Sequence, residues 1–114
     1  MNDCLFCQII SGELPSRKIY EDDEMLVFHD ISPMAPVHFL VVPKKHIKNL
    51  LELEAEDETL MGRLLFKAQV LAKEQGCEEN GGRFVINAKS DGVQTVDHFH
   101  IHFLGGRVFG WPPG

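Results

Sequence analysis

The segment HFHIHFL at residues 98–104 restricts the fold more than any other, because its periodicity is that of a β-strand with two unlike faces. Side chains of a strand point alternately to opposite sides of a sheet. One face of this strand is therefore expected to join an apolar core, and the other to present imidazoles. The two sets are Phe99, Ile101 and Phe103 on the first face, and His98, His100 and His102 on the second.

This row of histidines is open to three interpretations. The imidazoles could line a half-polar sheet face without any further role. A metal ion could bind them, but the outer Cα atoms lie roughly 13 Å apart at about 3.4 Å per residue, so one ion takes only one or two. One imidazole could also attack a substrate while its neighbours fix its tautomer. The spacing favours catalysis only slightly over metal binding.

The other segments predict an α+β fold with an antiparallel sheet of about five strands. Apolar residues at helical spacing predict a short helix that starts near Cys4 and stops at Gly12 and Pro15. The expected strands are one before an acidic turn at Asp22 and Asp23, one ended by Pro33 and Pro36, one closing at Pro43, one within residues 82–92 and the histidine strand within residues 97–107.

One long helix is expected from about Glu56 to Gln75. Its first turn is acidic and Gly76 follows its end, which suits the helix dipole and a glycine terminator. Apolar residues at helical spacing form a single stripe along it. The stripe consists of Leu60, Met61, Leu64, Leu65, Ala68, Leu71 and Ala72.

Length and charge narrow the class of protein. A chain of 114 residues, 44% of them apolar, predicts one soluble domain over residues 1–114. A net charge of −6 argues against nucleic acid or acidic membranes as partners, because both bind a basic face. No apolar run reaches the roughly 20 residues that span a bilayer, and the first residues lack the basic start of a signal peptide. Three cysteines, an odd number, suit a reducing compartment, so we expect a cytoplasmic protein.

Motifs along the whole chain resemble one known family. The segment HFHIHFL resembles the signature of the histidine triad (HIT) family of nucleotide hydrolases and transferases. The segments FHDISPMAPVHFLVVPKKHI, SDGVQTVDHFHIHFLGGR and the terminal WPPG are similar to its Hint branch, the nucleoside phosphoramidases. The resemblance extends from about Asp3 to Gly114 and implies a HIT-like fold in which two protomers form one continuous sheet.

The resemblance implies a covalent mechanism. His100 would attack the α-phosphorus of a purine nucleoside 5′-phosphoramidate and release the amine, and hydrolysis of the nucleotidyl-histidine would free AMP or GMP. A neutral imidazole with a pKa near about 6.5 is a good nucleophile at the pH of the cell. By the same resemblance, the main-chain carbonyl of His98 holds the other ring nitrogen of His100. His102 would contact phosphate oxygens, and His38 would belong to the proton network.

A nucleotide site is also implied by the resemblance. Asp30 would accept hydrogen bonds from the ribose hydroxyls, although it could instead cap the turn before Pro33. The apolar members could equally be ordinary core residues. The full set is Leu5, Phe6, Ile9, Phe28, Asp30 and Ile31 at the nucleoside, Asn87, Val93, Thr95 and Val96 at the phosphate, and Trp111, which would shape leaving-group specificity in the active site of a dimer partner.

Three positions depart from the common Hint pattern. Val93 stands where Gly is usual, Thr95 where Ser is usual and Asp97 where an aromatic residue is usual. Thr95 keeps the hydroxyl group. Val93 restricts the backbone of its loop and Asp97 adds a charge beside the triad, so the leaving-group preference and the rate stay open.

A second site is implied near the N-terminus. Cys4 and Cys7 form a C-x-x-C pair, which by itself could be two small apolar residues on a short helix. Many relatives hold a structural zinc ion with such a pair, the histidine after the third strand and the first histidine of the triad. The ligands here would be Cys4, Cys7, His46 and His98, which suit one tetrahedral Zn²⁺ per chain.

Assembly and activity leave alternatives. The resemblance implies a homodimer whose interface includes the long helix and the edge near Gly82 to Asn87. One alternative is a dinucleoside polyphosphate hydrolase, which shares the triad but not the WPPG tail. A nucleotide-binding regulatory module with little turnover is another, and a metal-dependent hydrolase that uses the histidine row is a third. No organic cofactor is expected.

Overall fold

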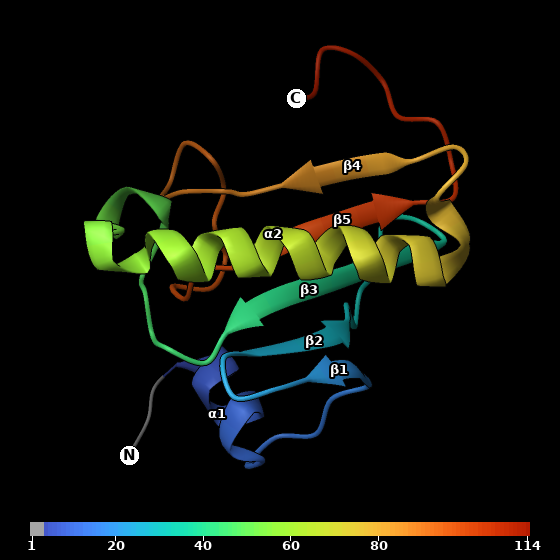
Figure 1. Ribbon diagram of the computed structural model, residues 1–114. Coiled ribbons are helices and arrows are strands. Elements are labelled where there is room, and N and C mark those ends of the chain that lie inside the picture. Colours follow the sequence, from blue (N-terminus) through green and yellow to red (C-terminus); the bar gives the residue numbers. More distant parts are fainter. Residues whose placement is uncertain (1–3) are drawn as a thin grey trace.

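One antiparallel sheet of five strands organises the structure, a computed structural model that describes residues 4–114. The strand order is β1-β2-β3-β5-β4, and helix α2 lies between β3 and β4 in the sequence (Figure 1). The predicted α+β fold is confirmed. The strands are β1 (Lys18–Glu21), β2 (Met25–His29), β3 (Val37–Pro43), β4 (Gly82–Val85) and β5 (Ile101–Gly105); the helices are α1 (Leu5–Ser11) and α2 (Glu58–Ala72), with short turns η1 (Leu50–Glu52), η2 (Ala55–Asp57) and η3 (Lys73–Cys77).

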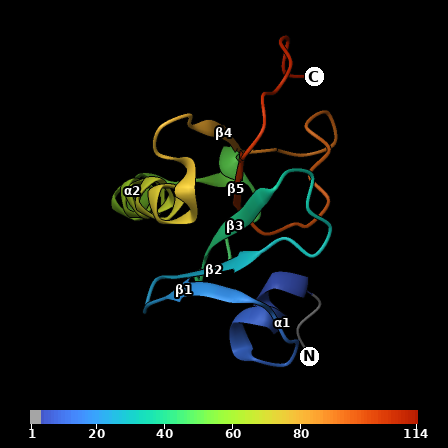
Figure 2. The ribbon, with the colours of Figure 1, turned by 90° about the vertical axis from the view of Figure 1, so that its right-hand side faces the viewer.

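The two helices lie on opposite sides of the sheet, as Figure 2 shows with the sheet nearly edge-on. The loop between β4 and β5 lies on the same side as α1 (Figure 2). Strands β2 and β3 are therefore covered on both faces, which explains why their sequences are continuous apolar runs rather than alternating ones. Met25, Val27, Phe39 and Val41 pack on the α2 side, and Leu26, Phe28, Leu40 and Val42 pack on the α1 side.

The alternation of the histidine row continues across the start of β5. Phe99, Ile101 and Phe103 are each 1% exposed and belong to the core on the α2 side. The ladder of β5 begins only at Ile101, so His98 and His100 precede the strand, and the prediction that they lie within it is wrong. The reason is that this stretch bonds elsewhere: the N–H of Phe99 donates to the carbonyl of Ile47 at 2.6 Å.

Helix α2 differs from the predicted helix at its first turn. The residues expected to form its first turn belong instead to the 3-10 turn η2, and α2 itself starts at Glu58. Gly76, with φ of 89°, ends the regular backbone, as expected. Within the apolar stripe, Leu65 is 50% exposed, whereas the neighbouring Leu64 is fully buried. In the described part of the chain, residues 4–114, no helix has the length and apolarity needed to cross a membrane.

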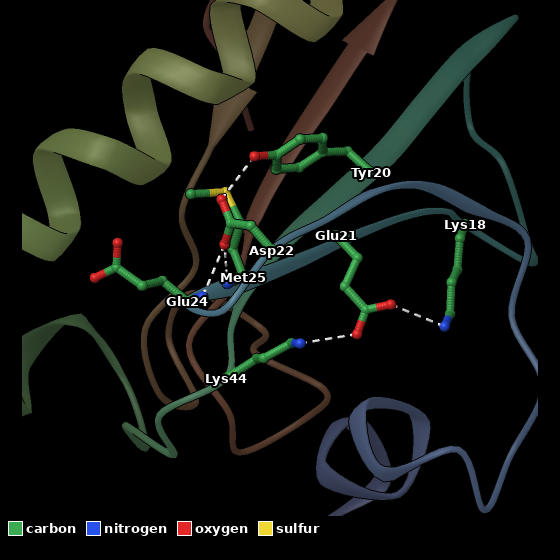
Figure 3. Close-up of polar contacts among 7 residues, drawn as sticks. All are labelled: Lys18, Tyr20, Glu21, Asp22, Glu24, Met25 and Lys44. Carbon is green, nitrogen blue, oxygen red and sulfur yellow. Dashed lines mark hydrogen bonds and ion pairs between the residues drawn. The ribbon is translucent and has the colours of Figure 1, made fainter.

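The β1–β2 turn is fixed by Asp22, one of the two aspartates predicted there (Figure 3). Its carboxylate accepts the N–H groups of Glu24 and Met25 at 2.7 and 2.9 Å, and the hydroxyl of Tyr20 at 2.7 Å. On the same hairpin, Glu21 pairs with Lys44 at 2.8 Å. The outer hairpin is thus joined to the end of β3, from which the chain runs to the predicted metal ligand His46.

Candidate functional site

Three of the predicted catalytic histidines gather on the α1 side of the sheet. In the β3–β5 ladder, Leu40 lies opposite His102, which places His38 diagonally beside it with ring centroids 5.2 Å apart. The ring centroid of His100 lies 4.9 Å from that of His102. The sheet register therefore brings residues 64 positions apart into direct contact.

The tautomer of His100 follows from one contact. Its Nδ1–H donates to the main-chain carbonyl of His98 at 2.7 Å, so in the neutral ring Nε2 carries the lone pair. Burial lowers the pKa of His100, against the opposing influence of that carbonyl and of Asp30. Phe6 of α1 packs against the ring at 5.0 Å in an edge arrangement. The ring is thus a neutral imidazole with an unprotonated Nε2, which is the form that acts as a nucleophile.

A relay of hydrogen bonds sets the tautomer of His102. The N–H of Met34 donates to Nδ1 of His38 at 3.0 Å, so the proton of a neutral His38 is on Nε2. That group lies 3.0 Å from Nδ1 of His102 and donates to it. The proton of His102 is consequently on Nε2. Burial is the main cause that lowers the pKa of His102 to about 4, so at neutral pH the ring is a neutral hydrogen-bond donor.

The same contacts decide between a proton relay and a metal site here. Asp30, His38 and His102 offer ligand atoms within 4.8 Å of one another. A metal on Nε2 of His38 would require a proton on Nδ1. That proton would point at the N–H of Met34, and two donors would face each other. This arrangement favours the relay and counts against the metal-dependent alternative. Asp30 accepts the N–H of Ser32 at 2.8 Å through one oxygen, so it does cap this turn, and its other oxygen lies 3.4 Å from Nε2 of His38.

The four predicted metal ligands also meet, with all four ligand atoms within 4.8 Å of one another. Nδ1 of His98 lies 3.0 Å from Nδ1 of His46, 3.3 Å from Sγ of Cys4 and 3.5 Å from Sγ of Cys7. Zinc bond lengths of 2.0 to 2.3 Å give a tetrahedron with edges of roughly 3.3 to 3.8 Å. The spacing and the donor set, two thiols and two imidazoles, therefore fit zinc.

His98 is prepared to act as a ligand by its own hydrogen bond. Its Nε2–H donates to the carbonyl of Pro43 at 2.7 Å, which leaves the lone pair on Nδ1, toward the cysteines. Burial lowers the pKa of His98 and favours the neutral ring that a metal requires. Cys77, in contrast, is a buried residue of the core on the α2 side, away from this cluster.

The predicted nucleoside residues are only partly brought together. Phe6, Ile9, Phe28 and Val96 share the apolar cluster on the α1 side, where Phe6 and Phe28 are each 5% exposed. Phe6 and Phe28 therefore pack in this cluster, and a role of either in nucleoside contact stays a prediction. Leu5, Ile31 and Trp111 are not brought into this cluster, with exposures of 45%, 97% and 83%.

The predicted phosphate residues lie in the loop between β4 and β5. Asn87 and Val96 are half-buried, and Thr95 is exposed. Val93 has φ of 56°, a left-handed conformation that is strained for a β-branched residue, and its side chain is 71% exposed. The glycine that is usual at this position in the Hint pattern would adopt this φ without strain.

Two groups that organise the site were missed in the sequence, because neither belongs to a local sequence pattern. They are the N–H of Met34 and the side chain of Gln94.

Comparison with known proteins assigns the chain. The family described as "Scavenger mRNA decapping enzyme C-term binding" matches residues 3–108. The chain is 51% identical over 112 residues to an uncharacterized HIT-like protein of Synechococcus elongatus, covering 98% of this chain and 97% of that one. It superposes with a TM-score of 0.96 on the crystal structure of a HIT family hydrolase from Legionella pneumophila Philadelphia 1, at 46% identity and with 98% and 100% of the two chains covered.

The chain belongs to the histidine triad family. The resemblance of the sequence to the HIT family is thereby confirmed, and a HIT family hydrolase is among the solved structures that the chain matches. It is also 46% identical over 114 residues to a 14 kDa zinc-binding protein of Brassica juncea, covering 98% of this chain and all of that one. In this HIT protein the fold matches that of a solved hydrolase over nearly the whole chain.

Stability should depend on pH through His102. An unfolded histidine has a pKa of about 6.5, whereas the pKa of His102 in the fold is about 4. Between these values the unfolded chain binds the additional proton, so the free energy of unfolding falls as the pH falls from about 6.5 to about 4. We expect the contribution of His102 to this loss to be roughly 2 kcal/mol, allowing for its partial exposure.

Urea denaturation of wild type and His102→Gln at about pH 7 and about pH 4.5 measures this contribution. The wild type should lose more stability than the variant over this interval. Protonation of groups that do not contact His102 affects both proteins alike and cancels, so the difference reports His102 together with its hydrogen-bond partner His38. Equal losses in the two proteins would contradict the shifted pKa.

Proposed function

We propose that this HIT protein is a purine nucleoside phosphoramidase that acts through a covalent nucleotidyl-His100. The observation that carries the proposal is the 2.7 Å hydrogen bond from Nδ1 of His100 to the carbonyl of His98, which leaves the Nε2 lone pair for attack. Family membership supports the hydrolase class. The phosphoramidate substrate is inferred from the likeness of the HFHIHFL and WPPG segments to the Hint branch.

The reaction proceeds in two displacements. In the first, a bond forms between Nε2 of His100 and the α-phosphorus, the bond from phosphorus to the amine nitrogen breaks, and the amine leaves with a proton drawn from solvent. In the second, water attacks phosphorus and passes one proton to solvent, and the bond to Nε2 breaks, which releases AMP or GMP and restores the lone pair. One difficult displacement is thereby divided into two easier ones.

The surroundings of His100 stabilise the charges that develop. While phosphorus is bound to Nε2, the ring is cationic and retains its Nδ1–H, so the carbonyl of His98 continues to accept it. The carboxylate of Asp30 is placed to favour this cation, since it also raises the pKa of the free ring. His102, neutral at working pH because of its pKa of about 4, donates its Nε2–H to a phosphate oxygen.

The nucleotide would lie over the α1 side of the sheet. Its ribose hydroxyls would donate to Asp30, and its base would contact the exposed Leu5 and Ile31. The side chain of Asn87 and the loop from Val93 to Val96 would receive the phosphate. Trp111 would reach the leaving group of a dimer partner, in keeping with its 83% exposure in the single chain.

Replacement of His100 tests the mechanism. His100→Ala removes the attacking nitrogen, and we expect the hydrolysis of adenosine 5′-phosphoramidate to fall by about 10³-fold or more. His29→Ala removes another histidine of the sheet and serves as the matched control, with turnover close to wild type. Release of AMP measured by chromatography gives both rates. A His100→Ala variant that retains wild-type turnover would refute the proposal.

The choice of substrate separates the remaining alternatives. A phosphoramidase should cleave adenosine 5′-phosphoramidate with a higher kcat/KM than a diadenosine polyphosphate, and the reverse order would indicate a dinucleoside polyphosphate hydrolase. A regulatory module would bind AMP without turning over either compound. A nucleotidyl adduct on the peptide of residues 90–107, found by mass spectrometry in wild type and absent in His100→Ala, would exclude the module.

We also propose that Cys4, Cys7, His46 and His98 hold one structural Zn²⁺ per chain. The spacing of the four ligand atoms within 4.8 Å supports this assignment, as does the zinc-binding relative from Brassica juncea. A closed set of four protein ligands supplies folding free energy and leaves no position for substrate. Two thiolate ligands require a reducing compartment, which supports a cytoplasmic location.

Zinc removal should affect stability more than chemistry. Elemental analysis should give about one zinc per wild-type chain and much less in Cys4→Ser. A chelator should lower the Tm of wild type by at least about 5 °C and leave the Tm of Cys4→Ser nearly unchanged. Cys77→Ser, which removes a thiol outside the cluster, should keep its zinc. A metal-free wild type of undiminished Tm would contradict the assignment.

A homodimer completes the proposal. Strand β4 is the outer strand of the sheet and exposes Phe84 at 45%, and helix α2 exposes Leu65 at 50%. Pairing of these surfaces between two copies would bury the apolar residues and extend the sheet. Analytical ultracentrifugation should therefore show a dimer, and a stable monomer at micromolar concentration would contradict this part.

A further inference from the structure

The side chain of Gln94 joins three backbone segments on the α1 side of the sheet. Its Oε1 accepts the N–H of Lys89 at 3.0 Å. Its Nε2 donates to the carbonyl of Lys48 at 2.8 Å and to the carbonyl of Val96 at 2.9 Å. Both N–H groups of the amide are therefore engaged, and one of the bonds spans 46 positions of the sequence.

The three backbone groups that the Gln94 side chain contacts, one N–H and two carbonyls, belong to segments of both proposed sites. Lys48 follows the metal ligand His46 by two residues, and Val96 precedes the metal ligand His98 by two residues. Lys89 begins the loop that leads to residues 93–96, the proposed phosphate-binding turn. Gln94 thus links the chain on either side of the metal cluster to the turn that would receive phosphate.

The loop is held in conformations that need external support. Lys89 and Val93 have φ values of 60° and 56°, which cost free energy for residues other than glycine. A Cβ at Gly92 would lie 2.8 Å from the backbone nitrogen of Ala88, so the loop closes tightly on itself. Within the loop, the N–H of Gln94 donates to the carbonyl of Lys89 at 3.0 Å. The contact to Lys48 is the hydrogen bond by which the Gln94 side chain ties this strained loop to the segment that carries His46.

We propose that Gln94 is a positioning residue that couples the Cys4/Cys7/His46/His98 cluster to the phosphate-binding turn. This inference rests on the proposed function, and it adds that the two sites are linked in affinity. Zinc bound at the cluster would hold the segment from His46 to Lys48 in one conformation. The hydrogen bonds of the Gln94 side chain would then restrict Val96 and Lys89 as well. The turn then binds nucleotide phosphate more tightly when the cluster holds zinc, and by linkage nucleotide raises the affinity for zinc by the same factor.

Replacement of Gln94 by Glu separates coupling from folding. Glu has the same length, but its carboxylate cannot donate to the carbonyls of Lys48 and Val96. The bond between the Gln94 N–H and Lys89 is retained, because it belongs to the backbone. Loss of two hydrogen bonds predicts a rise of about 10-fold in KM for adenosine 5′-phosphoramidate, with kcat changed much less, because His100 is not touched.

The decisive readout is the zinc affinity of the full-length protein, measured by competition with a chromophoric chelator, with and without saturating AMP. In wild type AMP should raise the affinity at least about fivefold, whereas in Gln94→Glu the ratio should fall below about twofold. Gln75→Glu, which adds the same charge in η3, should keep the wild-type ratio. Gln94→Met, which keeps the length and removes every polar contact, repeats the test if Gln94→Glu does not fold.

The outcomes separate the two proposals. A wild-type protein that binds no AMP would overturn the proposed nucleotide site, and one that binds no zinc would overturn the proposed zinc site and the coupling with it. A wild-type protein that binds both with a ratio near one would overturn the coupling alone. A ratio retained in Gln94→Glu or Gln94→Met, even with a lowered Tm, would show that Gln94 is merely structural and would overturn its role as the positioning residue.

Discussion

The hydrogen bond from Nδ1 of His100 to the carbonyl of His98, 2.7 Å long, is the contact on which the rest of the site depends. It selects the tautomer that places a lone pair on Nε2, and it would remain in place while that ring carries a positive charge. Its acceptor is rigid because His98 is itself held, through its ring by Pro43 and through the next residue, whose N–H donates to Ile47. The same residue thus supplies a carbonyl to the ring that we propose as the nucleophile and an imidazole nitrogen to the Cys4/Cys7/His46/His98 cluster.

The architecture of the sheet allows this double use. On the face that α2 covers, Phe99, Ile101 and Phe103 anchor the histidine segment in an apolar core. The opposite face is covered only in part by α1 and by the loop between β4 and β5 (Figure 2). Histidines on that side are buried enough for their pKa values to be lowered, as in His100 and His102, yet the polar relay through His38 stays connected to them.

The sequence predicted the elements and the side of the sheet for each histidine, because the period of two in β5 and the helical stripe in α2 are local properties. It could not show which members of the apolar stripe are buried, since that depends on how the sheet meets the helix, and Leu65 is 50% exposed. It started β5 too early, since the backbone partner of Phe99 lies in a distant segment, at Ile47. The N–H of Met34 and the amide of Gln94 could not be found in the same way. Every residue except proline has a main-chain N–H, and a single glutamine in a loop carries no periodic signal.

The most direct measurement of the central claim is the tautomeric state of the triad, obtained by long-range ¹H–¹⁵N NMR correlation of the imidazole nitrogens at neutral pH. The hydrogen bonds to His98 and Pro43 and the relay from Met34 predict that His100 is protonated on Nδ1 only, and that His98 and His102 are protonated on Nε2 only. A doubly protonated His100, or one protonated on Nε2, would leave no lone pair for attack and would contradict the account.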